Sequence, residues 1–399
     1  MDKREQRVQD TYYYLLIGLI VLASACSIFA QIQEISQSIR SLLNYFPWMI
    51  AVVYMLFYLN HINVAHFKLV MLLGVALFMY ILGLIFGMTY NFTSIYTYLI
   101  SGLVYCVGVL LGENISKKHF KFILKAICVA TLFFALYLYI AVLGGGTLYS
   151  ERTTGVAGKN SLSLIVAVPI VIMLYTTDVF PKLRWAFIPF LTFLVILIGS
   201  RTSMICCLAA LIGKVFVGNR NKKEKTVYTI ALVIVLYLLV INESFYDRVV
   251  NQIFLQGREL NEENIDKITS GRTEMQKGFW STFKQTWFIG GGGYAYENFY
   301  MDTLCKFGLV GAIPVFMFAF APIYYFFKDF EENNHKDIRA LIFALDILML
   351  INGLGEELPP FGPGVKCFVL WIVFGYYIGL RYKDERVENV QGVHSYSGI

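Results

Sequence analysis

The sequence predicts an all-α membrane protein that crosses the bilayer about twelve times. Of its 399 residues, 57% are hydrophobic and only 15% are charged, whereas a soluble domain carries about 25% charged residues. Aromatic residues are abundant, with 27 Tyr and 33 Phe. Apolar stretches of the length that spans a hydrocarbon core recur along the chain. We therefore expect residues 1–399 to form a single integral membrane domain.

Twelve stretches are apolar and long enough to be read as spans. The first follows a charged N-terminus without a small-residue cleavage site, so we expect it to remain as a span rather than be removed as a signal peptide. The two least certain spans, the seventh and eighth, are short and nearly adjacent. The predicted ranges are 11–31, 42–60, 67–87, 92–112, 120–143, 161–177, 183–199, 202–218, 226–242, 303–327, 338–355 and 363–381.

The distribution of Lys and Arg predicts the orientation of these spans. Cytoplasmic loops carry an excess of basic residues, and here the basic residues fall at both termini and in the even-numbered connections. Both termini are therefore predicted to be cytoplasmic. Four of the five histidines, His61, His66, His119 and His335, fall on the same side, and His394 is in the C-terminal tail. The basic residues of the even-numbered connections are Lys117, Lys118, Lys121, Lys182, Arg184, Arg220, Lys222, Lys223, Lys225, Lys328, Lys336 and Arg339.

Three arginines stand out because they fall on the predicted outer side. Arg152 follows the fifth span, Arg201 lies in the short turn GSRTS, and Arg272 lies in the long loop before the tenth span. Each alone has an ordinary explanation, as a residue at the membrane rim or at a solvated helix start. Taken together, and against the bias that depletes outer loops of arginine, they favour a shared anion site.

Residues 243–302 are predicted to form one long extracytoplasmic loop, inserted between spans nine and ten as a lid. The loop holds more acidic than basic residues, so any anion binding must be local. We expect helix over much of 242–264, with a polar break at NEENID, and a second, amphipathic helix over 273–287. Trp280 lies beside the apolar stripe of that second helix. Such a helix packs on the bundle, covers a lipid substrate, or does both; its stripe is Met275, Phe279, Phe283 and Trp287.

The start of the second loop helix suits a phosphate group. Arg272 follows Gly271 at this start, where free N–H groups and the positive end of the helix dipole are reinforced by a planar guanidinium. The run from Gly290 to Gly293 is expected to form a hinge or a close backbone approach. No nucleotide-binding loop with a GxxxxGK[ST] or strand–GxGxxG–helix context is present, which argues against an ATP-driven pump.

Glu297 is the first candidate for a general base. It lies just before the tenth span among aromatic residues, where desolvation raises a carboxyl pKa; the alternative is a glutamate that meets a helix dipole. Asn298 is expected to cap that helix or to orient Glu297. Glu356 and Glu357 form a second acidic pair, ranked lower because no other chemically interesting residue is near them in sequence.

Four aromatic residues are candidates for stacking on sugar rings, although residues of this kind are more often part of the membrane-interface belt. They are Tyr294, Tyr296, Tyr300 and Trp280. The seven cysteines and the histidines show no metal-ligand or disulfide spacing, so we expect no metal and no cofactor. The net charge of +6 is explained by the basic connections and is not a sign of nucleic-acid binding.

Four segments, in this order, resemble the O-antigen and capsule polysaccharide polymerases and their relatives, the O-antigen ligases. SERTTGVAGKNSLSL is similar to that family's outer-loop arginine and asparagine, which are Arg152 and Asn160 here. IGSRTS resembles its Ser-Arg turn at Arg201, and SGRTEMQKGFW resembles its lid-helix start at Arg272. FIGGGGYAYENFYMDTLCKFGLVGAI resembles the segment that leads into the next span. The matches extend over residues 150 to 315.

The resemblance implies an inverting, metal-independent glycosyltransferase of the GT-C type in the bacterial inner membrane, active on the outer face. Its donor would be a glycan on polyprenyl (undecaprenyl) pyrophosphate. Arg201 and Arg272 would hold the pyrophosphate, with Arg152 and Asn160 nearby. The acceptor would be a second lipid-linked repeat unit, and a chain-length regulator is a further candidate partner.

Glu297 departs from the ligase-type pattern, which has His before the Asn that matches Asn298. This departure favours a repeat-unit polymerase over a ligase, which remains the first alternative. A flippase or transporter of lipid-linked oligosaccharides is the alternative from another class. Transporters show internal repeats and polar residues near the midplane, whereas this sequence shows no repeat between its halves and gathers its polar residues at the outer face.

Overall fold

The structure of the protein is a computed structural model. It describes residues 3–32, 35–57, 67–86, 92–144, 158–216, 222–255, 257–261, 264, 268–269, 271–291, 296–332 and 334–396.

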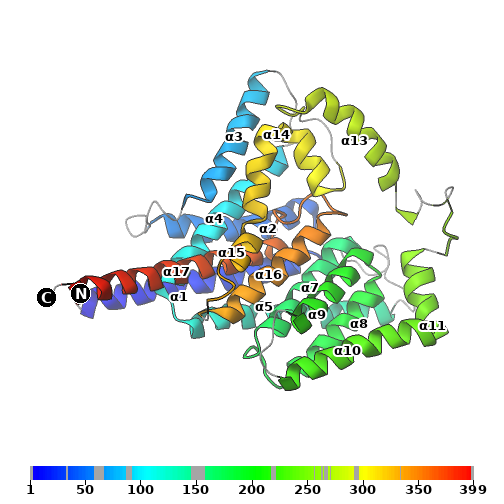
Figure 1. Cartoon of the computed structure of the whole chain (residues 1–399), viewed down its shortest axis with the longest axis horizontal. Coiled ribbons are helices and arrows are strands. Elements are labelled where there is room, and N and C mark those ends of the chain that lie inside the picture. The colour runs from blue at the N-terminus through cyan, green and yellow to red at the C-terminus, as the bar shows by residue number, and fades with distance from the viewer. Residues whose placement is uncertain are drawn as a thin grey trace.

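The described part of the chain is helical and contains no β-strand. Figure 1 shows the helices packed as one bundle, with α13 set apart at one edge. The start of α1 and the end of α17 lie close together. The helices are α1 (Lys3–Phe29), α2 (Gln37–Leu56), α3 (Val70–Ile85), α4 (Phe92–Asn114), α5 (Lys117–Gly144), α7 (Lys159–Tyr175), α8 (Arg184–Ile198), α9 (Arg201–Phe216), α10 (Lys222–Ile241), α11 (Glu243–Tyr246), the π-helix η3 (Asp247–Phe254), α13 (Arg272–Thr286), α14 (Phe299–Ala319), α15 (Ala321–Lys328), α16 (Lys336–Asn352) and α17 (Val365–Tyr396).

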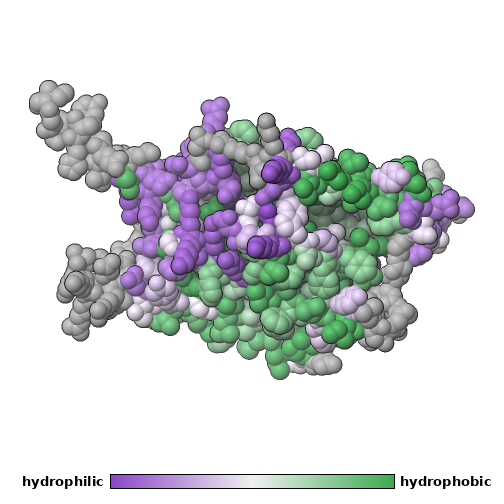
Figure 2. Space-filling model, turned by 90° about the horizontal axis from the view of Figure 1, so that it is seen from below, coloured by the Kyte–Doolittle hydropathy of each residue, from purple (hydrophilic) through white to green (hydrophobic). Residues whose placement is uncertain are grey.

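Where the structure describes them, all twelve predicted spans contain helix. Within the described residues, six helices are long and apolar enough to cross a membrane, namely α1, α2, α4, α5, α14 and α17, and the bent unit of α10, α11 and η3 would be a seventh if it forms one span. α3, α7 and α8 are apolar but shorter. The protein is therefore a polytopic helical membrane protein, as predicted, and the count of twelve spans stays a prediction. Figure 2 shows a broad apolar surface beside hydrophilic side chains that gather toward the end where α1 begins and α17 ends.

The centre of the bundle is a close contact between α4 and α17. Gly108 and Gly112 of α4 face Gly375 and Gly379 of α17, four residues apart on each helix. A Cβ atom on Gly112 would lie 2.2 Å from the Tyr376 carbonyl oxygen. Small residues at this spacing let two helix backbones touch, and membrane helices gain contact area in this way.

The predicted span 303–327 is not one continuous helix. It starts earlier, at Phe299, because Asn298 caps it, and the chain breaks between α14 and α15 at Phe320. Within α14 the backbone of Gly308 is non-helical, with φ 60° and ψ −173°. A break inside a span leaves backbone groups that need other partners.

The glycine-rich segment after α13 supplies those partners. The amide of Gly291 donates to the Cys305 carbonyl at 2.8 Å, and the amide of Leu309 donates to the Trp287 carbonyl at 2.7 Å. Gly290 approaches α14 so closely that a Cβ atom on it would lie 2.1 Å from the Lys306 carbonyl oxygen. The predicted close approach is confirmed for Gly290 and Gly291, and it attaches the end of α13 to the kink of α14.

The first half of the long loop differs from its prediction. Instead of helix over much of 242–264, α11 and η3 end at Phe254, and the chain bends by 90° between α10 and this helical unit. Val249 and Ile253 of η3 are buried, whereas Asp247 is exposed and accepts hydrogen bonds from Asn251 and Gln252. The second predicted helix, 273–287, is confirmed as α13 (Arg272–Thr286).

Gly308→Ala is expected to destabilise the protein. Its Cβ atom would lie 2.3 Å from the Phe288 carbonyl oxygen, in a backbone conformation that only glycine adopts readily, so we expect a loss of about 2 kcal/mol or more. Thermal melting in detergent measures this loss. Gly278→Ala is the control, because nothing lies within 4 Å of its Cβ position on α13; equal melting temperatures for the two variants would contradict the role given to the kink.

Candidate functional site

Several helix ends meet at one end of the bundle, here called the site end. α7, α9, α13, α14 and α17 begin there and α16 ends there. Hydrogen bonds between their first residues and the loop after α16 hold these ends together. The first N–H groups of a helix have no partner within the helix, and the N-terminus carries a partial positive charge. The site end therefore presents several positive helix ends to one region.

Asn160 links three of these elements. It lies in the first turn of α7, accepts a hydrogen bond from Ser200 Oγ at 3.2 Å, and donates through Nδ2 to Glu356 Oε1. Ser163 and Ser203, one turn deeper, are hydrogen-bonded at 2.7 Å and join α7 to α9. A polar column thus enters the bundle from the site end, beside the predicted residue Asn160.

Arg272 is the first residue of α13 and reaches the loop after α16. Its Nη2 donates to the Gly355 carbonyl at 2.7 Å and lies 3.5 Å from Glu297 Oε2. Its Nε–H is buried and donates to none of the described residues. Thr202 packs against the same stretch, since a Cβ atom on Gly355 would lie 3.2 Å from Thr202 Oγ1. Arg272 therefore sits between the lid helix, α9 and the carboxylate loop.

Arg201 begins α9 directly after a tight turn. Gly199 ends α8 in a left-handed conformation, with φ 71°, which lets the chain reverse within two residues. Arg201 donates through Nη1 to the carbonyl oxygens of Phe254, at 3.2 Å, and Ile268. Its positive charge lies close enough to that of Arg272 for the two to repel. An anion between them would relieve that repulsion.

Glu356 is the half-buried carboxylate of this site. Burial raises the pKa of its carboxyl above the usual glutamate value, and the negative charge of Glu297 adds to this. The hydrogen bond from Asn160 and the positive charges of Lys366 and Arg272 act in the opposite direction. The sequence ranked Glu356 below Glu297, because its partners come from residues far away in the chain.

Lys366 was not predicted as a site residue. It lies in the first turn of α17 and donates through Nζ to Ser161 Oγ at 2.6 Å, next to Asn160. The sequence offered only a weak signal for it, a lysine on the side predicted to be poor in basic residues.

The remaining predicted residues divide into four groups. Asn298 lies at the edge of the site, where its Oδ1 caps α14 and its Nδ2 donates to the Leu354 carbonyl at 3.1 Å. Tyr296 is buried against Phe279, and Tyr300 donates to the Leu350 carbonyl at 2.9 Å. Trp280 is exposed on α13. Arg152 and Tyr294 lie outside the described residues.

An apolar groove of about 470 Å³ leads away from Arg201 along the bundle. Phe254, whose carbonyl accepts the hydrogen bond from Arg201, lines it. The groove runs between α7, α8, α9 and the bent unit of α10, α11 and η3. Its other lining residues include Leu174, Val195, Leu208, Leu211, Val235 and Val249. Such a groove fits a hydrocarbon chain whose polar end lies at Arg201.

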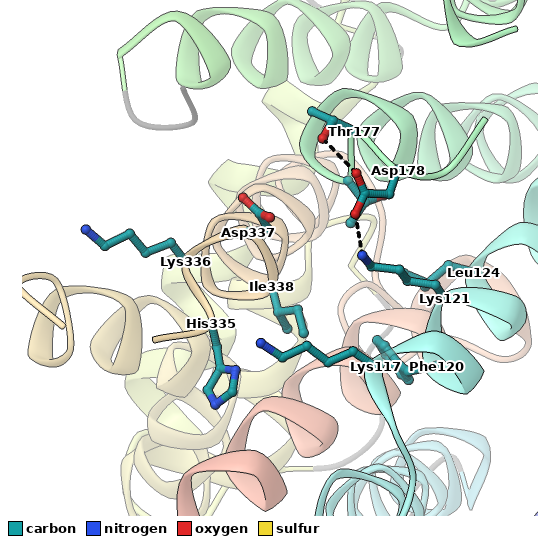
Figure 3. Close-up of a pocket in the computed structure, with 11 residues that line it drawn as sticks. Lys117, Phe120, Lys121, Leu124, Thr177, Asp178, His335, Lys336, Asp337 and Ile338 are labelled. Atoms are coloured by element: carbon teal, nitrogen blue, oxygen red, sulfur yellow. Dashed lines mark hydrogen bonds and ion pairs between the residues drawn. The ribbon is translucent and has the colours of Figure 1, made fainter. Parts of the chain in front are cut away.

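A second cavity, of about 310 Å³, lies at the opposite end of α7 and α16 (Figure 3). Both helices have 17 residues, so about 25 Å separates the two places. Lys121 and Thr177 both reach Asp178 in this cavity, and Lys117, Lys336 and Asp337 also line it. It shares no residue with the site end, and His335 and His119 lie on its side of the molecule.

The arrangement of guanidinium groups, helix N-termini and a half-buried carboxylate suits group transfer from a phosphorylated lipid. Residues 185–316 match the family model described as O-antigen ligase. The predicted resemblance to the O-antigen polymerase and ligase family is thereby confirmed for this segment. No curated protein matches the chain.

The O-antigen ligase match covers about a third of the chain, from α8 to most of α14. It includes Arg201, Arg272 and Glu297 and leaves out Asn160 and Glu356. It supports a membrane glycosyltransferase of the O-antigen ligase and polymerase type that acts with lipid-linked oligosaccharides in the bilayer. Arg272, through the Gly355 carbonyl, joins the matched segment to the loop between α16 and α17, and Ser200 joins it to Asn160 of α7.

Asn298→Ala is expected to act on stability more than on chemistry. Both polar atoms of the side chain already have partners, since Oδ1 caps α14 and Nδ2 donates to the Leu354 carbonyl. Loss of an asparagine cap costs about 1 kcal/mol. Thermal melting in detergent measures the loss. Asn298→Asp keeps the capping oxygen and should lose less. A variant that melts like the wild type but no longer transfers sugar would instead assign Asn298 to the substrate.

Proposed function

We propose that the protein is a polysaccharide polymerase that transfers a glycan from a polyprenyl pyrophosphate carrier to the non-reducing end of a second lipid-linked repeat unit. The reaction is inverting and proceeds without a metal. The observation that carries the proposal is the proximity of Arg201 and Arg272, at the starts of two helices, to a half-buried carboxylate and an apolar groove.

The two arginines stabilise the departing pyrophosphate. Breaking the bond between the anomeric carbon and the phosphate oxygen leaves negative charge on the pyrophosphate, and preorganised positive groups lower the barrier to this step. Arg201 and Arg272 supply planar donors, and the N-termini of α9 and α13 supply free N–H groups. Arg152 and Asn160 belong to the same region in the family resemblance, and Asn160 contacts Ser200 next to Arg201.

The apolar groove accommodates the start of the polyprenyl tail. It reaches from Phe254, beside Arg201, into the part of the bundle formed by α7 to α10. The tail of a pyrophosphate held by Arg201 could thus enter the neighbouring apolar groove. The exposed sugars of donor and acceptor then lie under and around α13, with residues 243–302 acting as the lid.

The orientation follows from the basic residues at the end opposite the site. Lys117, Lys121, Lys336, Arg339 and Arg381 cluster there, and basic residues mark the cytoplasmic side. The termini are then cytoplasmic and the site end faces outward from the bacterial inner membrane. The polymer made there is an O-antigen or capsule polysaccharide, and a chain-length regulator is its expected protein partner.

A ligase is the second candidate, because the matched family model is described as O-antigen ligase. Both enzymes use the same donor and differ only in the acceptor. The two are separated with purified protein, chelator and the lipid-linked oligosaccharide that accumulates in a strain lacking this protein. A ladder of lengthened lipid-linked products supports the polymerase, whereas transfer only to an added lipid acceptor supports the ligase.

Arg201→Ala and Arg272→Ala are each expected to lower the transfer rate by about 100-fold or more, since each removes a donor that stabilises the leaving group. The rate of lengthening in the purified system measures this effect. In cells, lipid-linked repeat units should accumulate unpolymerised on the outer side.

Lys284→Ala is the matched control, because it removes a positive charge from an exposed position near the far end of α13. It should leave the rate within a few-fold of the wild type. Accumulation of repeat units on the cytoplasmic side in the arginine variants would point to a flippase and against the proposal.

Leu208→Trp is expected to raise KM for the long-chain donor by about tenfold, which corresponds to about 1.4 kcal/mol, because the larger ring fills the groove at α9. A donor with a tail of only a few isoprene units should be affected much less. Ile212→Trp is the control, since Ile212 is on the same helix but is exposed outside the groove. Equal effects on both donors would exclude the groove as the tail site.

A further inference from the structure

We infer that Glu356, rather than Glu297, is the catalytic residue that accepts the proton of the acceptor hydroxyl. This inference rests on the proposed glycosyl transfer. In that reaction the acceptor oxygen forms a bond to the anomeric carbon, and the bond from that carbon to the pyrophosphate oxygen breaks. The pyrophosphate leaves with the bonding electron pair, and the acceptor proton moves to the carboxylate.

The surroundings of the two carboxylates differ in the way that general-base catalysis requires. Glu297 is 57% exposed, and its contact within the site is the ion pair with Arg272 at 3.5 Å. Glu356 is half-buried in the loop after α16, where Asn160 fixes one of its oxygens by a hydrogen bond. A general base must be held in place and must have a pKa closer to the working pH than that of a free carboxylate.

Glu356 is also tied to the group that holds the leaving pyrophosphate. The carbonyl of Gly355, one residue before it, accepts the hydrogen bond from Arg272 Nη2 at 2.7 Å. The position of the base and the position of the guanidinium are therefore set by the same peptide. Glu297 instead forms an ion pair with the guanidinium itself. It therefore orients Arg272 and partly neutralises its positive charge.

One hydrogen-bonding group and three charged groups face Glu356, and they come from four elements. Asn160 and Lys366 approach from α7 and α17, Arg272 from α13, and Glu297 from the start of α14. Burial raises the pKa of Glu356, whereas Asn160, Lys366 and Arg272 lower it. The base acts only when ionised, so activity falls as the pH falls through this pKa. Removal of Lys366 raises the pKa and moves this loss of activity to higher pH.

The test compares Glu356→Gln with Glu297→Gln in the purified system, using the lipid-linked oligosaccharide that accumulates in a strain lacking this protein. Glu356→Gln should lower kcat by about 100-fold or more, the range for loss of a general base. It should leave KM little changed, and donor should still raise the melting temperature. Glu297→Gln should lower kcat by less than tenfold. Glu356→Asp should restore part of the activity.

Lys366→Met provides a readout that a structural role would not give. The acid limb of its profile of kcat against pH should move to higher pH relative to the wild type. The inference is overturned if Glu356→Gln keeps near wild-type kcat while Glu297→Gln loses it, or if the Lys366→Met profile does not move. Failure of the wild type to consume the donor would instead reject the proposed glycosyl transfer, so the two failures are distinguishable.

Discussion

The fold and the site both depend on the need of every backbone N–H and C=O group in an apolar bundle to find a partner. Inside hydrocarbon an unpaired group costs several kcal/mol, so helix ends and breaks collect where polar partners are available. Here α7, α9, α13, α14 and α17 begin at one end, and the loop after α16 supplies carbonyls and a carboxylate to them. The positive charge of the site end is thus partly a property of the backbone, and Arg201 and Arg272 add to it.

The same constraint explains how the lid is attached. The kink of α14 at Gly308 frees backbone groups in the middle of a span, and the segment after α13 satisfies them. Two glycines, Gly290 and Gly308, make the contact possible because a side chain on either would meet the other's backbone. The far end of α13 is therefore fixed to the bundle, while Arg272 fixes its first turn through Gly355. Between them, Phe279 packs on Tyr296 and Cys305.

Much of the fold could be predicted from the sequence, because apolar length and charge bias act locally along the chain. Helices were predicted at all twelve stretches, and α13 was placed within one residue at each end. The break of α14 was not predicted, since Gly308 is one glycine in an apolar run and its partner lies in the loop before it. The end of η3 at Phe254 was also missed, because the sequence places its polar break later, at NEENID.

The site was only partly predictable for the same reason. Arg201, Arg272 and Glu297 belong to segments with a local signature, a turn or a helix start after glycine. Glu356 has no such signature, and its chemistry comes from Asn160, 196 positions away in sequence. Tyr296 and Tyr300 lie next to a candidate base in sequence, but their contacts with a ring and a carbonyl come from distant or neighbouring helices, and their stacking on sugar rings stays a prediction.

In the proposed reaction, the single side chain of Arg272 connects the departure of the pyrophosphate with the transfer of the acceptor proton to Glu356. One Nη atom contacts the peptide that carries Glu356 and also faces Glu297, while the buried Nε–H has no described partner. A lysine has one point charge and could not hold a carbonyl and an anion in fixed directions at once, whereas the planar guanidinium can. The charge of Arg272 also opposes the effect of burial on the pKa of Glu356. In the proposed reaction, a bound pyrophosphate would offset that positive charge and raise the pKa of Glu356, so donor binding itself would make the carboxylate a stronger base.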